Sequence, residues 1–164
     1  MNITAFQNPD GVLFRLSDHA IHEGLTASRK NRRKRMILPI HRSQDANVQR
    51  LINFLQPGTY IRPHLHPLPH ATESIVLLQG SIRFFTFNEN GKVQTDHLLT
   101  SNLIPDIVDI EPGTWHSFLV LETDTIIFEC KKGPYDAKND KQFAKWAPEE
   151  EDPDAKEFMK KLLV

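Results

Sequence analysis

Cysteine is almost missing from this chain of 164 residues, which holds Cys130 and no second cysteine. One cysteine cannot form a disulfide within the chain, so a disulfide-stapled secreted module is excluded. A single unpaired cysteine suits a reducing compartment, and we expect a cytoplasmic protein. Residues 1–15 also lack the cationic start and apolar run of a signal peptide. No stretch approaches the roughly 18 apolar residues of a membrane span, so we expect no membrane partner.

An excess of charge is missing as well. The 20 lysines and arginines face 21 acidic residues, for a net charge of -1, so no overall field attracts polyanions. The run from Arg29 to Arg35 is locally basic, but no stacking aromatics or nucleic-acid motif accompany it, and we expect no nucleic-acid partner. We favour an exposed arm that contacts the acidic run Glu149–Asp152. Binding of a phosphate-bearing sugar is the second interpretation.

Composition and length favour one globular domain over residues 1–164, because 39% of residues are hydrophobic and 25% are charged. Within it we expect an N-terminal arm at 1–47, a β core at 48–132 and a C-terminal extension at 133–164. The arm is predicted to hold a helix from Asp18 towards Ala27, capped by Ser17. The extension is predicted to hold an amphipathic helix within Asp154–Leu163, where apolar residues recur at helical spacing.

The core consists of short apolar runs separated by proline, glycine and asparagine, a pattern typical of antiparallel strands. The predicted strands are Val48–Leu55, Thr59–Arg62, Ser74–Leu78, Ser81–Phe87, Val93–Leu98, Ile107–Ile110, Ser117–Leu121 and Thr125–Cys130. Turn residues such as Pro57-Gly58 and Pro112-Gly113 lie between them. Many short strands at regular spacing indicate an all-β sandwich or barrel with two antiparallel sheets.

Four residues form a candidate metal site. His64 and His66 are two positions apart, so in a strand both imidazoles point to the same face. Glu73 directly precedes a predicted strand, and His116 follows the Pro112-Gly113 turn. Nitrogen and oxygen donors without a thiolate suit Zn, Fe, Ni, Cu or Mn. The two neighbouring histidines alone could equally be a hydrogen-bonded surface pair, but glycines spaced around the four residues favour a metal site.

Five further residues are candidates for contacting a substrate: Arg62, His41, His70, Trp115 and Tyr135. In a regular strand Arg62 would share the face of His64 and His66, whereas a kink at Pro63 would turn it outward. The alternative for His41 is a solvated or backbone-bonded histidine. The alternative for His70 is a loop residue at the pocket rim. The alternative for Trp115 and Tyr135 is packing in a core or an interface.

At these positions the sequence resembles the cupin superfamily. The motif G-x5-H-x-H-x3-4-E-x6-G is matched by Gly58, His64, His66, Glu73 and Gly80, although six residues separate His66 from Glu73. The second motif, P-x-G-x-x-H-x3-N, is matched at Gly113 and His116, with its proline displaced to Pro112 and Val120 in place of asparagine. The resemblance implies a cupin jelly-roll barrel with short N-terminal and C-terminal helices, and a homodimer.

A closer resemblance is to the WbuC-like small cupins, and it covers nearly the whole chain. The matching segments include Pro57–Pro67, Glu111–His116, Gly133–Asp136 and Asp140–Pro148. In that family the longer gap before the glutamate is usual. The resemblance implies that His64, His66, Glu73 and His116 bind a divalent Zn, Fe, Ni or Mn ion, and that the protein is encoded among polysaccharide biosynthesis genes.

Two functional hypotheses follow from this ligand set. The first is a metal-dependent enzyme, an isomerase, epimerase or dioxygenase, that acts on a small polar substrate such as a sugar derivative. The second is a non-catalytic metal-bearing module that binds or senses a carbohydrate or an anion. A deep pocket with an acid or base beside the metal site favours the enzyme. A closed, dry barrel favours the module.

Overall fold

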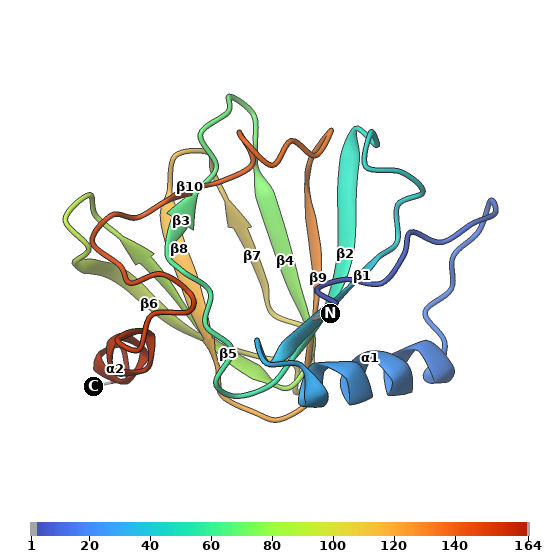
Figure 1. The fold of residues 1–164 in the computed structure, drawn as a ribbon, viewed down its shortest axis with the longest axis horizontal. Helices are drawn as coiled ribbons and strands as arrows, with labels where there is room; N and C mark the ends of the chain where they lie inside the picture. Colours follow the sequence, from blue (N-terminus) through green and yellow to red (C-terminus); the bar gives the residue numbers. More distant parts are fainter. Residues whose placement is uncertain (1–2, 164) are drawn as a thin grey trace.

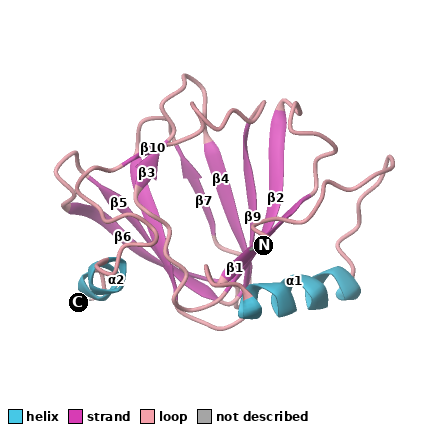
Figure 2. Ribbon diagram, viewed as in Figure 1, coloured by secondary structure: helices cyan, strands magenta, loops and turns pink. Residues whose placement is uncertain are grey.

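Two antiparallel five-stranded sheets face each other in the computed structural model, which describes residues 3–163 (Figures 1 and 2). The first sheet has the order β1 (Arg35–Pro39), β2 (Val48–Leu55), β9 (Thr125–Lys132), β4 (Glu73–Gln79) and β7 (Ile107–Ile110). The second has the order β10 (Gln142–Phe143), β3 (His64–Leu65), β8 (Trp115–Val120), β5 (Ser81–Phe87) and β6 (Val93–Thr100). The predicted all-β jelly-roll barrel is confirmed.

Two short helices pack on the outer faces of the sheets. Helix α1 (Asp18–Lys30) begins after Ser17, whose Oγ accepts a hydrogen bond from the Ala20 amide at 3.2 Å. It lies close against β2, because a Cβ on Gly24 would come within 2.2 Å of the Phe54 ring. Helix α2 (Ala155–Lys161) contributes Met159 to a cluster on the second sheet. Within residues 3–163, no helix combines the length and the apolar character that a membrane crossing requires.

The predicted strand Thr59–Arg62 is wrong. This segment forms one isolated bridge, between Tyr60 and Leu119, because its carbonyl groups are hydrogen-bonded by side chains instead of a strand ladder. The Tyr60 carbonyl accepts from Arg35 Nη1 at 2.7 Å, and the Arg62 carbonyl accepts from His64 Nδ1 at 3.0 Å. Two strands lie outside the expected core of 48–132, since β1 pairs with β2 and β10 pairs with β3.

The space between the sheets changes in character along the strands. Alternate side chains of each strand point inward, and at one end these are aliphatic and aromatic. This core consists of Leu55, Ile75, Leu77, Ile82, Phe84, Leu99, Ile110, Phe118, Val120 and Ile127. Further along the same inward faces stand Asn53, Glu73, Glu129, Lys131 and His116. One end of the barrel is therefore a packed core, and the other end is lined by polar groups.

The basic run and the acidic run pair within one chain, so the expected contact between them is present, whereas the expected exposure of the basic run holds for part of it only. Glu150 accepts hydrogen bonds from Arg33 Nε at 2.6 Å and from Arg35 Nη2 at 2.9 Å. Arg35 is buried, so this end of the run is not an exposed arm. Arg32 and Glu151 form a looser, solvent-exposed pair at 3.8 Å. The contact fastens the C-terminal extension to the start of β1.

Replacing Glu150 by glutamine tests this fastening. Burial raises the pKa of Glu150, but hydrogen bonds and charges from Arg33 and Arg35 outweigh it and lower the pKa below its ordinary value of 4.5. At neutral pH we expect E150Q to lower the free energy of unfolding by about 1–3 kcal/mol, because Arg35 loses its charged partner. A depressed carboxyl pKa stabilises the fold above the pKa of the unfolded chain. The difference should therefore shrink as the pH falls through the folded-state pKa.

The matched control is E151Q, which removes the neighbouring exposed carboxylate and should change the free energy of unfolding by less than about 0.5 kcal/mol. Urea denaturation of both variants at pH 7 and pH 3.5 measures these differences. Equal effects of the two substitutions at pH 7 would contradict the assigned role of Glu150.

Candidate metal centre

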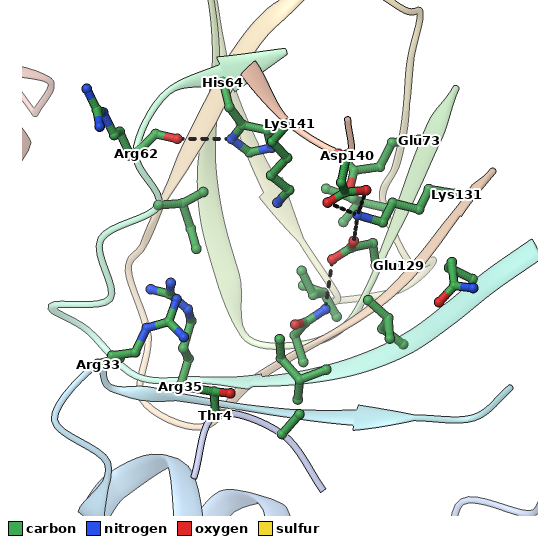
Figure 3. A pocket seen from close by; sticks show the side chains of 18 of the residues that line it. Thr4, Arg33, Arg35, Arg62, His64, Glu73, Glu129, Lys131, Asp140 and Lys141 are labelled. Carbon is green, nitrogen blue, oxygen red and sulfur yellow. Dashed lines mark hydrogen bonds and ion pairs between the residues drawn. The ribbon is translucent and has the colours of Figure 1, made fainter. Parts of the chain in front are cut away.

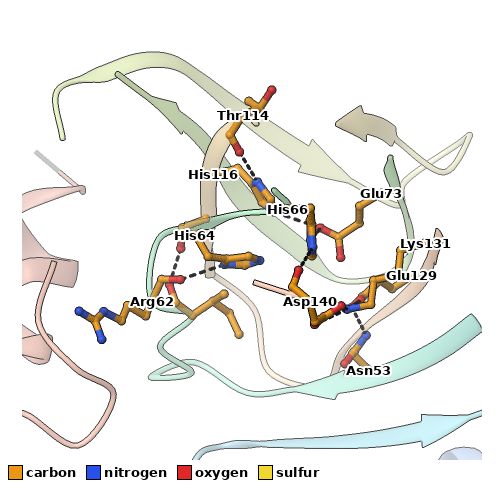
Figure 4. A network of polar contacts seen from close by, with 12 residues as sticks. Asn53, Arg62, His64, His66, Glu73, Thr114, His116, Glu129, Lys131 and Asp140 are labelled. Atoms are coloured by element: carbon orange, nitrogen blue, oxygen red, sulfur yellow. Dashed lines mark hydrogen bonds and ion pairs between the residues drawn. The ribbon is translucent and has the colours of Figure 1, made fainter. Parts of the chain in front are cut away.

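Four buried side chains from three segments of the chain converge at the polar end of the barrel (Figure 4). They are His64, His66, Glu73 and His116, and each offers one donor atom within 4.8 Å of the others. His64 on β3 is paired directly with His116 on β8, and the Phe84 ring is stacked on His116 with 6.0 Å between ring centroids. The long loop at 67–72 still brings Glu73 to the cluster, at the first residue of β4.

Hydrogen bonds to backbone carbonyls orient all three imidazoles. The Nδ1 atoms of His64, His66 and His116 lie 3.0, 2.6 and 2.9 Å from the carbonyl oxygens of residues 62, 140 and 114. A carbonyl can only accept, so each Nδ1 carries the proton and donates it. Each neutral ring then presents the lone pair of Nε2 to the centre. Such hydrogen bonds from the far ring nitrogen fix the tautomer of metal-binding histidines.

The centre of the cluster fits a cation. Glu73 Oε2 lies 3.0 Å from His116 Nε2 and 3.3 Å from His66 Nε2, while His64 Nε2 is buried without a hydrogen-bond partner among the described residues. Three lone pairs and a carboxylate that face one another are unfavourable unless a positive charge lies between them. The donor set of three imidazoles and one carboxylate is the kind that first-row divalent metals prefer.

The electrostatics of the cluster also keep His64 and Glu73 in the protonation states that bind metal. Burial lowers the pKa of His64 well below its ordinary value, and the charge of Lys141 lowers it further. Burial alone would raise the pKa of Glu73, but the close contacts with His116 and His66 and the charge of Lys141 outweigh it and bring the pKa well below the usual range. Neutral imidazole and ionised carboxylate are the states that bind metal.

A cavity of about 890 Å³ opens from this cluster and is walled by both sheets and by the C-terminal extension (Figure 3). Its lining includes His64, Glu73 and His116 on one side and the aliphatic Ile75, Ile127 and Leu55 at its inner end. A volume of this size accommodates a small molecule. Three of the four convergent residues therefore line an open pocket, and the cluster is not sealed inside a closed barrel.

Charged residues of the cavity wall that were not predicted from the sequence include Glu129, Lys131 and Asp140. Lys131 Nζ lies 2.6 and 2.8 Å from the two carboxylate oxygens of Asp140, and Asn53 Nδ2 donates to Glu129 Oε2 at 3.0 Å (Figure 4). Strand periodicity could have found two of them, because Glu129 and Lys131 share the inward face of β9 with the buried Ile127. Asp140 follows no strand pattern.

These charges perturb one another strongly. Burial raises the pKa of Glu129 to about 7, and the negative charge of Glu73 adds to the effect although Lys131 opposes it. Burial lowers the pKa of Lys131, but Glu129, Asp140 and Glu73 outweigh it, so the pKa is raised and the ammonium stays charged. A carboxyl with a perturbed pKa inside a cleft is characteristic of functional sites.

The structure brings three of the five candidate substrate contacts to the cavity. Tyr135 lines it from an exposed position, and His41 lines it as a fully buried ring whose Nδ1 accepts from the Arg50 amide at 3.0 Å. Arg62 lies at the wall, but its guanidinium points away from the histidines (Figure 4). It donates to the Ala144 carbonyl at 2.9 Å, because the segment before Pro63 is not a strand and the expected alternation fails.

The other two candidates, Trp115 and His70, do not line the cavity. Trp115 adjoins His116 in β8 and therefore points to the opposite face of the sheet, where its ring centroid lies 6.2 Å from that of Trp146. His70 is exposed in the loop after His66 and has a positive φ of 63°. The alternatives given above, a packed tryptophan and a loop histidine, describe these two residues.

Comparisons with known proteins give a family match and a fold. A family model described as a domain of unknown function, DUF6016, matches residues 16–99. Two curated proteins from Haemophilus influenzae, strains 10810 and ATCC 51907, are similar to this chain at 36% and 34% identity over 67 residues. Both carry the name probable S-adenosyl-L-methionine-dependent methyltransferase TehB. The matched stretch covers 39% of this chain but 23% of theirs.

Among solved structures, CapF with the inhibitor 3-isopropenyl-tropolone matches with a TM-score of 0.54 and 17% identity, over 65% of this chain and 30% of CapF. Oxalate decarboxylase from Bacillus subtilis at pH 4.6 matches with a TM-score of 0.48 and 19% identity, over 60% of this chain and 24% of that enzyme. The chain thus spans less than a third of these proteins. The likeness to CapF, a cupin-fold protein, shows the cupin fold.

Replacing Lys131 by methionine tests the charge network beside the four-residue cluster. The substitution leaves Asp140 without its ionic partner, and the carbonyl of Asp140 is the group that orients His66. We expect a loss of about 3 kcal/mol in the free energy of unfolding, since removal of one partner of a buried ion pair leaves the other charge buried and unpaired. The matched control K132M removes an exposed lysine and should cost less than about 0.5 kcal/mol. Thermal and urea unfolding check both values, and a K131M variant as stable as K132M would contradict the network.

Proposed function

This chain belongs to the DUF6016 family of domains of unknown function, and we propose that it is a metal-dependent enzyme acting on a small polar substrate. One observation carries the proposal: four donor side chains converge beside a cavity of about 890 Å³, three of them line it, and the same cavity also contains other titratable groups. A non-catalytic binding or sensing module would need the cluster but not the additional buried carboxyl beside it. The arrangement therefore favours the enzyme.

We assign His64, His66, Glu73 and His116 as the ligands of a divalent Zn, Fe, Ni or Mn ion. Their support is the orientation of the three Nε2 atoms and the unpartnered Nε2 of His64, described above. The bound metal would act as a Lewis acid on an oxygen atom of the substrate. This is the requirement shared by isomerisation, epimerisation and related chemistry on sugar-derived molecules.

The chain's own residues would bind and orient the substrate. The Glu129 carboxyl lies in the same cavity, where the Asn53 amide holds it in place and where it can exchange a proton with a substrate. The buried aliphatic groups Ile75 and Ile127 exclude water from the inner end. Exposed Tyr135 and buried His41 would contact the parts of the substrate that lie further from the cluster.

We further propose that the protein is a WbuC-like small cupin associated with polysaccharide biosynthesis and located in the cytoplasm. The support is the sequence resemblance of the segments Pro57–Pro67, Glu111–His116 and Asp140–Pro148, together with the single cysteine. We also propose that residues 1–164 act as one domain. The support is that β1, from the N-terminal arm, is a strand of the first sheet, and β10, from the C-terminal extension, is a strand of the second sheet.

We also propose a homodimer, which the resemblance to cupins implies. The exposed apolar side chains of Val12 and Leu13 on the N-terminal arm support it. Sedimentation equilibrium should give a mass of about twice the 18.9 kDa of one chain. V12S and L13S together should shift the mass towards the monomer if the arm forms the contact. A mass of 18.9 kDa at high protein concentration would contradict the dimer.

Metal content tests the ligand assignment. Protein purified without a histidine tag should contain close to one equivalent of a divalent metal by elemental analysis. H64A and H116A should each lose it, because removal of one of four donors leaves an incomplete site. H97A, which removes an exposed histidine of β6, should retain it. Full metal retention in H64A or H116A would show that the assignment is wrong.

The same variants test catalysis. Metal-loaded protein incubated with a panel of small sugars, sugar acids and hydroxy acids should convert at least one of them, as followed by proton NMR. H116A should convert none, and H97A should match the unmodified protein. Binding of a compound without conversion would favour the module over the enzyme.

A further inference from the structure

Lys141 differs from the other cationic residues of the cavity wall. Arg33 and Arg35 are paired with Glu150, Arg62 with Glu149, and Lys131 with Asp140. Lys141 also lines the cavity, yet no ion pair or side-chain hydrogen bond joins it to another residue in 3–163. Asp140, its neighbour in the chain, is fully engaged because both of its carboxylate oxygens accept from Lys131.

The backbone holds Lys141 in place beside the candidate metal centre. On one side, the Asp140 carbonyl accepts a hydrogen bond from His66 Nδ1 at 2.6 Å. On the other side, β10 pairs with β3, so that Gln142 is opposite Leu65 and Phe143 is opposite His64. Figure 3 shows the Lys141 side chain pointing into the cavity. The backbone of Lys141 is therefore held next to the segments that carry His64 and His66, two of the four clustered residues.

The charge of Lys141 acts on the interior of the cavity. It contributes to the lowered pKa values of His64 and Glu73 and opposes the rise in the pKa of Glu129. An ammonium group that faces a partly buried cavity without a partner loses part of its hydration and gains no ion pair in return. An anionic ligand would supply the missing partner.

We propose that Lys141 binds the carboxylate of an anionic substrate whose other oxygen is directed at His64, His66, Glu73 and His116. The inference rests on the proposed function and narrows its substrate class from small polar molecules to small carboxylates with a neighbouring oxygen. A single unmatched ammonium balances one negative charge. A phosphate group carries nearly two charges and is less well matched, because the arginines of the wall are already paired.

Calorimetric titration of the metal-loaded, full-length protein with glycolate tests the proposal, with ethylene glycol as an uncharged probe of similar size. Glycolate should bind at least tenfold more tightly than ethylene glycol. K141M should weaken glycolate binding by about tenfold to a hundredfold, the usual size of a hydrogen bond to a charged group. K141R should retain most of the affinity. The matched control K138M, which removes an exposed lysine of the same loop, should bind glycolate normally.

Metal content and melting temperature, measured on the same samples, separate the two proposals. Equal metal content and equal melting temperatures in K141M and the unmodified protein, with glycolate affinity lost, support the inference. Equal glycolate affinity in both metal-loaded proteins overturns it and leaves the metal site intact. Tighter binding of inorganic phosphate than of glycolate overturns the carboxylate assignment. An unmodified protein that binds no metal overturns the proposed function and the inference together.

Discussion

The candidate site depends on three hydrogen bonds that leave imidazole Nδ1 atoms and end on backbone carbonyls. Two are local, since the carbonyl lies two residues before the histidine that it orients: Arg62 for His64 and Thr114 for His116. The third spans 74 positions, from Asp140 to His66. Because each bond fixes which ring nitrogen carries the proton, all three are needed for the Nε2 lone pairs to face one centre. The four candidate ligands all lie within the β core, but the orientation of one of them, His66, depends on a carbonyl of the C-terminal extension.

The barrel can support such a site because its two ends have different chemistry. Along β9, inward positions change from Ile127 to Glu129 and Lys131, and along β4 they change from Leu77 and Ile75 to Glu73. The aliphatic end supplies the buried area that stabilises the fold. The polar end would be costly alone, but ion pairs and hydrogen bonds satisfy most of its charged groups, while His64 Nε2, His41 Nε2 and Arg62 Nε are buried without a partner among the described residues.

The sequence alone predicts those features whose determinants lie close together in the chain. Strands Val48–Leu55, Ser81–Phe87 and Ile107–Ile110 were predicted with their observed bounds, because alternation and turn residues define them locally. The clustering of the four candidate ligands also followed from short spacings and a family resemblance. Thr59–Arg62 failed because its carbonyls bond to side chains from elsewhere, including Arg35. Asp140 and Lys141 were missed as site residues, since no local pattern shows that their loop returns to His66.

The C-terminal extension couples the fold to the chemistry of the site. Its β10 strand pairs with β3, its Pro148 carbonyl accepts a hydrogen bond from the Tyr60 hydroxyl, and its Glu150 binds the start of β1. Between these attachments it contributes the carbonyl that orients His66 and the ammonium group of Lys141. The orientation of one candidate metal ligand and the charge on one side of the cavity are thereby set by adjacent residues on one segment. A change in the path of that segment would alter both together, because Asp140 and Lys141 cannot move independently across one peptide bond.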